Sequence, residues 1–261
     1  MSTMSYTLAD SATMVRRQIK HMRRYPALTL QLVGLPVVFL LLFVFVFGGT
    51  LGDGLGSGPG GRGAYVDYVT PGILLMAVAA VATGTAISVA MDMTEGIVAR
   101  FRTMAIARVS VLTGHVIGAM IQTFVAVAVV LAVALAIGFR PDAGVVEWLA
   151  AAGVVAMLGF ALTWLTVAMG LVSKTVESAS NLPMPLTFLP FLGSGFVPTD
   201  SMPAGLRWFA EYQPFTPVIE TLRGLLLGTG IGSSGILAVA WSAGIALVGY
   251  LWAKKLYNRQ A

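Results

Sequence analysis

The segment EGIVARFRTM, residues 95–104, is a short charged stretch between two long apolar runs, residues 69–91 and 111–138. Each run can cross a bilayer, because a membrane-spanning helix needs about 20 apolar residues. The charged segment cannot lie in hydrocarbon, so it has to lie on one face of the membrane. It presents there a small amphipathic surface on which a soluble partner could push. This pattern suggests a membrane protein that receives its energy from outside itself.

Composition places the whole chain in the membrane. The 261 residues are 57% hydrophobic and 10% charged, with a mean hydropathy of +0.86. Soluble domains carry about 25% charged residues. Cysteine is absent, which excludes disulfides and thiolate metal sites. The length leaves room for about six spans and none for a separate soluble catalytic domain.

Apolar length predicts an all-α integral membrane protein with one transmembrane domain over residues 1–261. None of the predicted spans contains Asp, Glu, Lys or Arg. The six spans are residues 27–47, 69–91, 111–138, 148–172, 180–197 and 233–253.

The basic residues predict how the chain is oriented. Twelve of the sixteen Lys and Arg residues fall on the side of the two termini, whereas Arg62, Arg140, Arg207 and Arg223 fall on the other. The positive-inside rule therefore places both termini in the cytoplasm. Six spans, an even number, agree with that orientation.

Two regions flank the spans. Residues 1–26 mix apolar and basic residues at roughly helical spacing, which predicts an amphipathic interfacial helix; a simple basic topology anchor is the alternative. Residues 198–232 are neither fully apolar nor freely polar. They predict two short helices folded back into the outer leaflet and separated by Pro214 and Pro217. On the second of these helices, Glu220 and Arg223 are predicted to pair at i,i+3.

A polar stripe follows one face of the second span. Thr85, Ser88, Asp92 and Glu95 are spaced by 3, 4 and 3 residues, from mid-membrane to the cytoplasmic surface. They could line a pathway between helices. Alternatively, the hydroxyls bond their own helix or a neighbour.

The fifth span contains Pro183, Pro185 and Pro190, which prevent a regular helix. Lipid cannot satisfy the freed carbonyls, so this span should face a second protomer or a cavity. A kinked packing helix is the alternative. With Thr85 and Ser88, the pathway candidates are Pro183, Phe188 and Phe191.

No enzyme constellation is present. The histidines are His21 and His115, and the chain has no HExxH, GxSxG or Walker A lysine. Ion coupling usually needs an ionisable group at bilayer depth, and the six cores carry no charge. His115, near the cytoplasmic end of the third span, is expected to face the interface as a structural histidine.

Three stretches carry a family resemblance. They are EG (95–96) with RFRTM (100–104), GSGFVPTDSMP (193–203), and QPFTP (213–217) with ETLRG (220–224). With them, nearly the whole chain resembles the membrane subunit of an ATP-binding-cassette exporter of the second permease type, the kind found beside daunorubicin- and doxorubicin-resistance ATPases.

The resemblance implies roles that spacing does not. Within a coupling region at 92–110, residues 92–108 would form the coupling helix that docks on the ATPase. The N-terminal helix would be the connecting helix, and the helices of 198–232 would form an external gate. Family members often have proline where this chain has Ala105, which leaves the end of the coupling helix open. The coupling candidates are Glu95, Gly96, Arg100, Phe101, Arg102 and Met104. The gate candidates are Pro198, Met202, Pro203, Glu220 and Arg223.

The expected function is export of a hydrophobic or amphipathic molecule, such as a drug, lipid or glycolipid, across a bacterial cytoplasmic membrane. The resemblance implies two cytoplasmic ATPase subunits, which bind ATP and Mg²⁺, and a second permease chain, identical or homologous. No cofactor or metal is expected in this chain, and the partners include membrane lipids but no nucleic acid. The alternatives are a stand-alone ion-coupled carrier or channel, a polysaccharide or glycolipid exporter of the same family, and an anchoring protein without transport.

Overall fold

The computed structural model describes residues 26–55, 61–94 and 108–259, with isolated positions between 13 and 24. Every regular element in this part of the chain is helical. Five helices in it are long and apolar enough to cross a membrane. The protein is therefore an all-α integral membrane protein with several spans, as its composition predicts.

The long helices follow the predicted spans closely, with ends that differ by up to seven residues. The first span continues through a π-helical turn, η1, and a short helix, α3. The bounds are α2 (Pro26–Leu42), η1 (Phe43–Phe47), α3 (Gly48–Asp53), α4 (Arg62–Thr94), α6 (Arg108–Ala136), α7 (Val145–Val172) and α12 (Ser234–Arg259).

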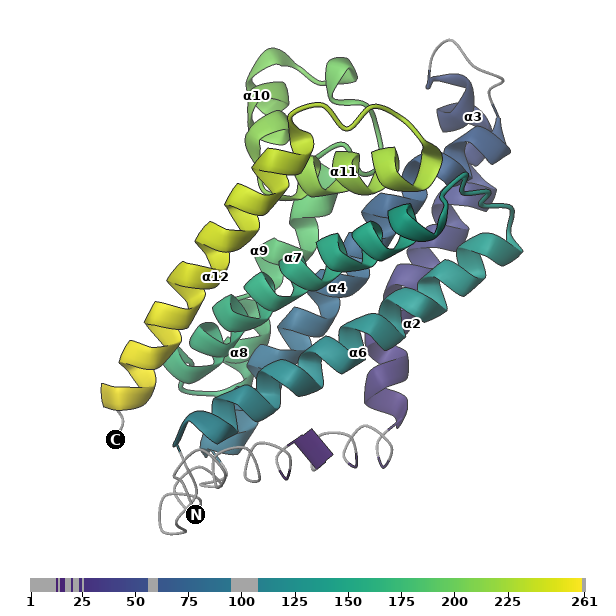
Figure 1. Ribbon diagram of the computed structural model, residues 1–261. Coiled ribbons are helices and arrows are strands. Elements are labelled where there is room, and N and C mark those ends of the chain that lie inside the picture. The colour runs from purple at the N-terminus through teal and green to yellow at the C-terminus, as the bar shows by residue number, and fades with distance from the viewer. Residues whose placement is uncertain are drawn as a thin grey trace.

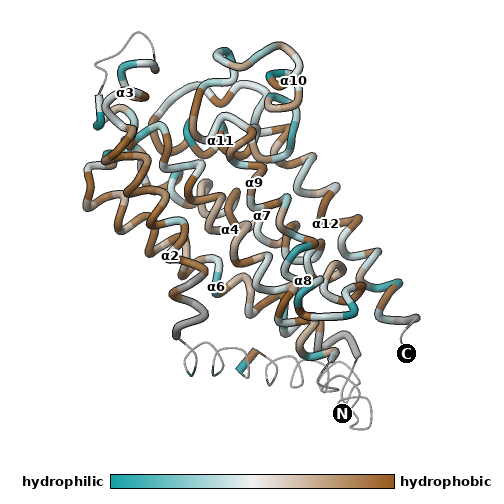
Figure 2. The backbone as a smooth tube through the Cα atoms, turned by 180° about the vertical axis from the view of Figure 1, so that it is seen from behind, coloured by the Kyte–Doolittle hydropathy of each residue, from teal (hydrophilic) through white to brown (hydrophobic). Residues whose placement is uncertain are grey.

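The helices form a bundle with two distinct ends (Figure 1). At one end α4 and α12 finish and α6 begins; this is called the Asp92 end. At the other lie α3 and the two short helices α10 and α11; this is called the Arg223 end. Figure 2 shows hydrophobic residues along the long helices and more hydrophilic ones toward their ends and connections.

Helix α4 is the centre of the bundle. In its apolar window 72% of the residues are buried, compared with 22–33% in the other four long helices. Small side chains make this close packing possible, because they let neighbouring backbones approach. A Cβ atom on Gly170 of α7 would lie 2.6 Å from the carbonyl oxygen of Ala86 and 2.9 Å from Cβ of Val89.

The predicted fifth span is not one helix. It consists of α8 (Val176–Asn181), α9 (Met184–Phe188) and a 3₁₀ turn, η2 (Leu189–Leu192). The prediction that its prolines prevent a regular helix is confirmed. The segment runs antiparallel to α4: the hydroxyls of Thr83 and Thr187 lie 3.4 Å apart, and farther along, Gly72 meets Gly195.

Two short helices follow, as the proline pattern predicts. They are α10 (Ala204–Tyr212) and α11 (Phe215–Leu227), preceded by the 3₁₀ turn η3 (Thr199–Ser201). Pro214 separates α10 from α11, but Pro217 lies inside the first turn of α11 rather than between the helices. A proline is tolerated there because the first backbone N–H groups of a helix have no intrahelical partner.

Candidate functional site

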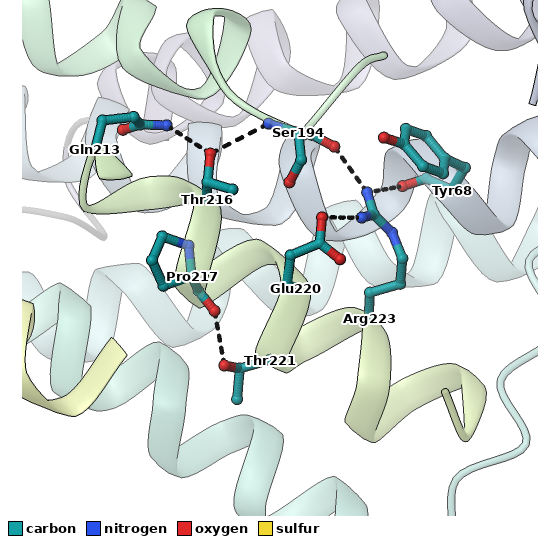
Figure 3. A network of polar contacts seen from close by, with 8 residues as sticks. All are labelled: Tyr68, Ser194, Gln213, Thr216, Pro217, Glu220, Thr221 and Arg223. Atoms are coloured by element: carbon teal, nitrogen blue, oxygen red, sulfur yellow. Dashed lines mark hydrogen bonds and ion pairs between the residues drawn. The ribbon is translucent and has the colours of Figure 1, made fainter. Parts of the chain in front are cut away.

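Arg223 of α11 is buried at the Arg223 end and binds three oxygen atoms from three parts of the chain (Figure 3). Its Nη1 donates to Oε1 of Glu220 at 2.6 Å. Its Nη2 donates to the backbone carbonyls of Ser194 at 2.8 Å and Tyr68 at 3.1 Å. A single guanidinium therefore joins α11 to α4 and to the turn after the broken segment.

The surroundings explain how a charge is tolerated there. Burying a guanidinium is costly unless it is paired and hydrogen-bonded. The half-buried Glu220 supplies the opposite charge, and the guanidinium carbon lies 3.9 Å from the centre of the Tyr68 ring, close enough for a cation–π contact. The predicted Glu220–Arg223 pair at i,i+3 is present.

A second set of polar contacts begins α11 (Figure 3). Oε1 of Gln213 accepts from the backbone N–H of Phe215 at 3.0 Å, and Nε2 of Gln213 donates to Oγ1 of Thr216 at 3.1 Å. Oγ1 of Thr216 accepts in turn from the backbone N–H of Ser194 at 3.3 Å. These contacts fix the start of α11 against the same turn that Arg223 holds. The residues of both sets are called the outer network: Tyr68, Ser194, Gln213, Thr216, Glu220 and Arg223.

The turn at 193–196 also packs directly on α4. The hydroxyl of Tyr65 donates to the carbonyl of Phe196 at 3.1 Å. A Cβ atom on Gly72 would lie 2.7 Å from both Cα and the carbonyl oxygen of Gly195, so only glycine fits at this crossing. Sequence reasoning did not select Tyr65, Gly72, Gly195 or Gln213, although the GSG (193–195) and QPFTP (213–217) stretches lie inside the family-like motifs.

Two atoms of the outer network have no hydrogen-bond partner in the described structure: Nε of Arg223 and Oγ of Ser194, both buried. Buried polar atoms are nearly always paired in stable cores, and each orphan costs free energy. The network is therefore less stable than it would be if each of its buried polar atoms had a hydrogen-bond partner.

The other gate candidates lie beside this network rather than in it. Pro198 and Met202 flank η3 and are half-buried, and Pro203 is exposed just before α10. The hydroxyl of Ser201 donates to the carbonyl of Pro198 at 2.7 Å, which closes the turn. The structure thus brings Glu220 and Arg223 together and leaves the three others on the surface turn that precedes α10.

The pathway candidates on α4 behave differently from one another. Thr85 is buried, and its hydroxyl donates to the carbonyl of Val81 in its own helix at 3.0 Å. The alternative reading, a hydroxyl that bonds its own helix, therefore accounts for Thr85. Ser88 is half-buried. A pathway along this face remains a prediction.

The broken segment that carries the other pathway candidates packs along α4, and one of these candidates, Phe191, reaches α2. Pro183 is buried, Phe188 is 52% exposed and Phe191 is half-buried. The ring of Phe191 stacks on that of Phe196 with centroids 4.3 Å apart, and it lies edge-on to Phe39 of α2 at 5.3 Å. The first and fifth predicted spans thus meet through aromatic side chains.

Asp92 and His115 form a buried contact at the Asp92 end. Nε2 of His115 lies 3.1 Å from Oδ2 of Asp92, and both residues are less than 8% exposed. The prediction that His115 faces the membrane interface was wrong, because a carboxylate 23 residues earlier in the chain lies close enough to accept its hydrogen bond. The predicted coupling residues Glu95, Gly96, Arg100, Phe101, Arg102 and Met104 lie outside the described residues.

In the part of the chain that the structure describes, no three His, Asp or Glu side chains are grouped so as to hold a metal ion. The polar side chains of the outer network and of the Asp92–His115 pair form hydrogen bonds with other parts of the same chain. The outer network connects α11, α4 and the turn at 193–196 at one end of the bundle, and the Asp92–His115 pair joins two helices at the other.

Comparison with known proteins gives this arrangement a family. Residues 11–227 match the family model described as ABC-2 type transporter. The chain is 28% identical over 256 residues to the daunorubicin resistance ABC transporter permease protein DrrB1 of Streptomyces coeruleorubidus, an alignment that covers 97% of this chain and 88% of that protein. It is 26% identical over 219 residues to the probable doxorubicin resistance ABC transporter permease protein DrrC of Mycobacterium tuberculosis, covering 82% and 75%. The chain belongs to the ABC-2 type transporter family, as a multi-pass membrane permease.

Proposed function

We propose that this protein is the membrane subunit of an ATP-driven exporter that moves a hydrophobic or amphipathic molecule, such as a drug, out of the cell. The observation that carries the proposal is the family match over residues 11–227, together with two relatives named for daunorubicin and doxorubicin resistance. The cargo class rests on those names.

The energy comes from a separate ATP-binding-cassette subunit in the cytoplasm, which binds ATP and Mg²⁺ and hydrolyses the nucleotide. Two permease chains, identical or homologous, pair with two such subunits. Both termini lie on the cytoplasmic side of a bacterial plasma membrane, as the concentration of Lys and Arg on that side of the chain supports. The Asp92 end is then cytoplasmic, and the Arg223 end faces outward.

Helix α4 is suited to carry the movement between the two ends. Asp92 and Tyr68 are 24 residues apart in one continuous helix, a distance of about 36 Å at 1.5 Å per residue. The predicted coupling region continues from one end of α4, and the outer network holds the other. A displacement of the cytoplasmic end of α4 therefore strains the contacts that Arg223 makes with Tyr68.

Outward opening requires α11 and the turn at 193–196 to separate from α4. The carbonyls of Ser194 and Tyr68 would then be released by Arg223, which keeps its partner Glu220 on the same helix. The unpaired Nε and Oγ atoms lower the cost of that release. We infer that the outer network acts as a reversible external closure.

The test is transport by the permease together with an ATP-binding-cassette ATPase, which we expect to be encoded by a neighbouring gene. Inside-out vesicles or proteoliposomes should accumulate doxorubicin when ATP and Mg²⁺ are added. Accumulation should stop when the Walker A lysine of the ATPase is replaced, and it should survive an ionophore that collapses ion gradients. Transport that persists without the ATPase and is abolished by the ionophore would instead identify an ion-coupled carrier.

The coupling role of residues 92–110 has its own test at Phe101. Truncating an aromatic side chain that fills a pocket costs about 3–5 kcal/mol, so Phe101→Ala should weaken docking and Phe101→Asp should abolish it. Phe160→Ala, at a 43% exposed position on α7, is the matched control and should retain transport. If Phe101→Asp leaves both transport and cargo-stimulated ATP hydrolysis unchanged, Phe101 has no coupling role.

A further inference from the structure

Asp92 and His115 stand on either side of the segment that joins α4 to α6. Asp92 is in the last turn of α4, and His115 is seven residues into α6. Their side chains are 9% and 4% exposed, and Oδ2 and Nε2 are 3.1 Å apart. The end of α4 and the start of α6, which flank the predicted coupling region and are called its two stems, are therefore joined by a buried hydrogen bond.

A buried contact of this kind resists separation more than a surface pair does. If the two helices moved apart, a carboxylate and an imidazole would each lose a partner in a poorly solvated place, which costs more than an exposed ion pair can contribute. A carboxylate can only accept, so an ionised Asp92 pairs with the tautomer of His115 in which Nε2 is the donor. The pair thus favours motions in which the ends of α4 and α6 stay together.

The opposite end of the same two helices has a different connection. The backbone N–H of Arg140, just after α6, donates to Oδ1 of Asp67 on α4 at 3.1 Å. This contact involves an exposed arginine and lies at the far end of α4 from the coupling region. It provides a natural control, because it links α4 and α6 without flanking the segment between them.

Close helix packing also connects α7 and α12 to α4 and α6. Gly170 of α7 fits against Ala86 and Val89 of α4, one to two turns from Asp92. Gly249 of α12 fits against Trp164 and Leu165 of α7, where a Cβ atom would lie 2.6 Å from the backbone nitrogen of Leu165. A joint movement of α4 and α6 would therefore carry α7 and α12 with it.

We propose that Asp92 and His115 are a positioning pair that makes the cytoplasmic ends of α4 and α6 move as one rigid unit. A push on the segment between these helices then moves both, and α4 carries the motion to the outer network. Without the pair, the same push would spread the two stems apart and lose its effect on α4. This inference rests on the proposed function for its transport consequence, but the joining of the two stems can be measured separately.

The first test measures the cargo moved per ATP hydrolysed by the assembled transporter. Asp92→Ala and His115→Ala should lower this ratio about tenfold, the effect expected for one buried hydrogen bond to a charged group, while ATP hydrolysis continues. Asp67→Ala should leave the ratio unchanged. The exchanged variant D92H/H115D, which restores the pair in reverse, should recover most of it. Equal ratios in Asp92→Ala and Asp67→Ala, or no recovery in the exchanged variant, would overturn the proposal.

The second test does not depend on transport. The chain has no cysteine, so spin labels can be placed at Met91 and Ile117, which are 40% and 39% exposed beside the pair on α4 and α6. The distance distribution should be narrow with and without ATP, and broad in the Asp92→Ala variant. If the label distances are already broad in the protein that keeps Asp92 and His115, the inference is overturned even if transport is ATP-driven. If they are narrow in that protein and broad in the Asp92→Ala variant, the joining of the two helix ends is upheld even if transport is not ATP-driven. If the alanine variants do not fold, the exchanged variant decides both measurements.

Discussion

Arg223 of α11 donates a hydrogen bond to the backbone carbonyl of Tyr68 at 3.1 Å, and its guanidinium carbon lies 3.9 Å from the centre of the Tyr68 ring. The hydrogen bond is to the backbone, so it reports the position of α4 rather than the identity of residue 68. The ring contact depends on an aromatic residue. The contacts of Arg223 therefore depend both on the position of α4 and on the aromatic side chain at residue 68.

Replacing Arg223 tests the outer closure. Arg223→Ala leaves the carbonyls of Ser194 and Tyr68 without this donor and should destabilise the protein by about 1.5–3 kcal/mol, the usual range for hydrogen bonds to charged groups. Arg223→Lys keeps the charge but not the planar fork, and it should recover only part of the loss. Thermal unfolding in detergent measures the stability, and leakage of a small solute from proteoliposomes measures the closure.

Arg207→Ala is the control for that series. Arg207 of α10 is exposed and pairs with Glu211 at 2.7 Å and with Asp200 at 2.5 Å. Its hydrogen bond to Glu211 and the charges of Asp200 and Glu211 raise the pKa of Arg207, so it stays charged at any physiological pH. Surface pairs contribute little, so neither unfolding nor leakage should change noticeably. An equal effect of both substitutions would show that α10 and α11 need a positive charge but no buried contact.

The crossing of Gly72 and Gly195 gives a second prediction. Gly72→Ala places a methyl group 2.7 Å from the backbone of Gly195 and should cost about 1–3 kcal/mol, as overpacking usually does. The turn at 193–196 should move away from α4 and weaken the bond from Tyr65 to Phe196. Gly153 lies on an exposed face of α7, where an added Cβ atom would have no atom of another part of the chain within 4 Å, so Gly153→Ala should be close to neutral. Unfolding midpoints of the three proteins decide the matter, and a neutral Gly72→Ala would contradict the tight crossing.

Cysteine substitutions test whether the broken segment lies beside a second permease chain. Phe188 is 52% exposed although the prolines next to it leave carbonyls that lipid cannot satisfy. Phe188→Cys should therefore cross-link between two copies in membranes, or change its labelling when ATP is added. Phe124→Cys, at a 42% exposed position on α6, should give no cross-link between copies and should react with lipid-soluble reagents. Identical labelling at the two positions would place the segment at the lipid boundary.

The periodic and local features of the chain were predictable from the sequence. Apolar length predicted the long helices, because a helix in lipid must satisfy its backbone internally and needs a minimum number of apolar residues. Pro183, Pro185 and Pro190 predicted the broken segment, since proline removes a donor and clashes with the preceding turn. Glu220 and Arg223 were predicted as a pair because residues three apart share a helix face.

Only the tertiary structure decided which distant residues meet. Tyr68 and Arg223 are 155 residues apart, and neither hydropathy nor helical spacing relates them. The position of His115 was mispredicted for the same reason, because its acceptor Asp92 belongs to another helix. The central place of α4 also depends on how the other helices pack around its small residues. Apolar length and helical period determine that a helix forms and crosses the membrane, whereas side-chain packing and buried hydrogen bonds select its neighbours.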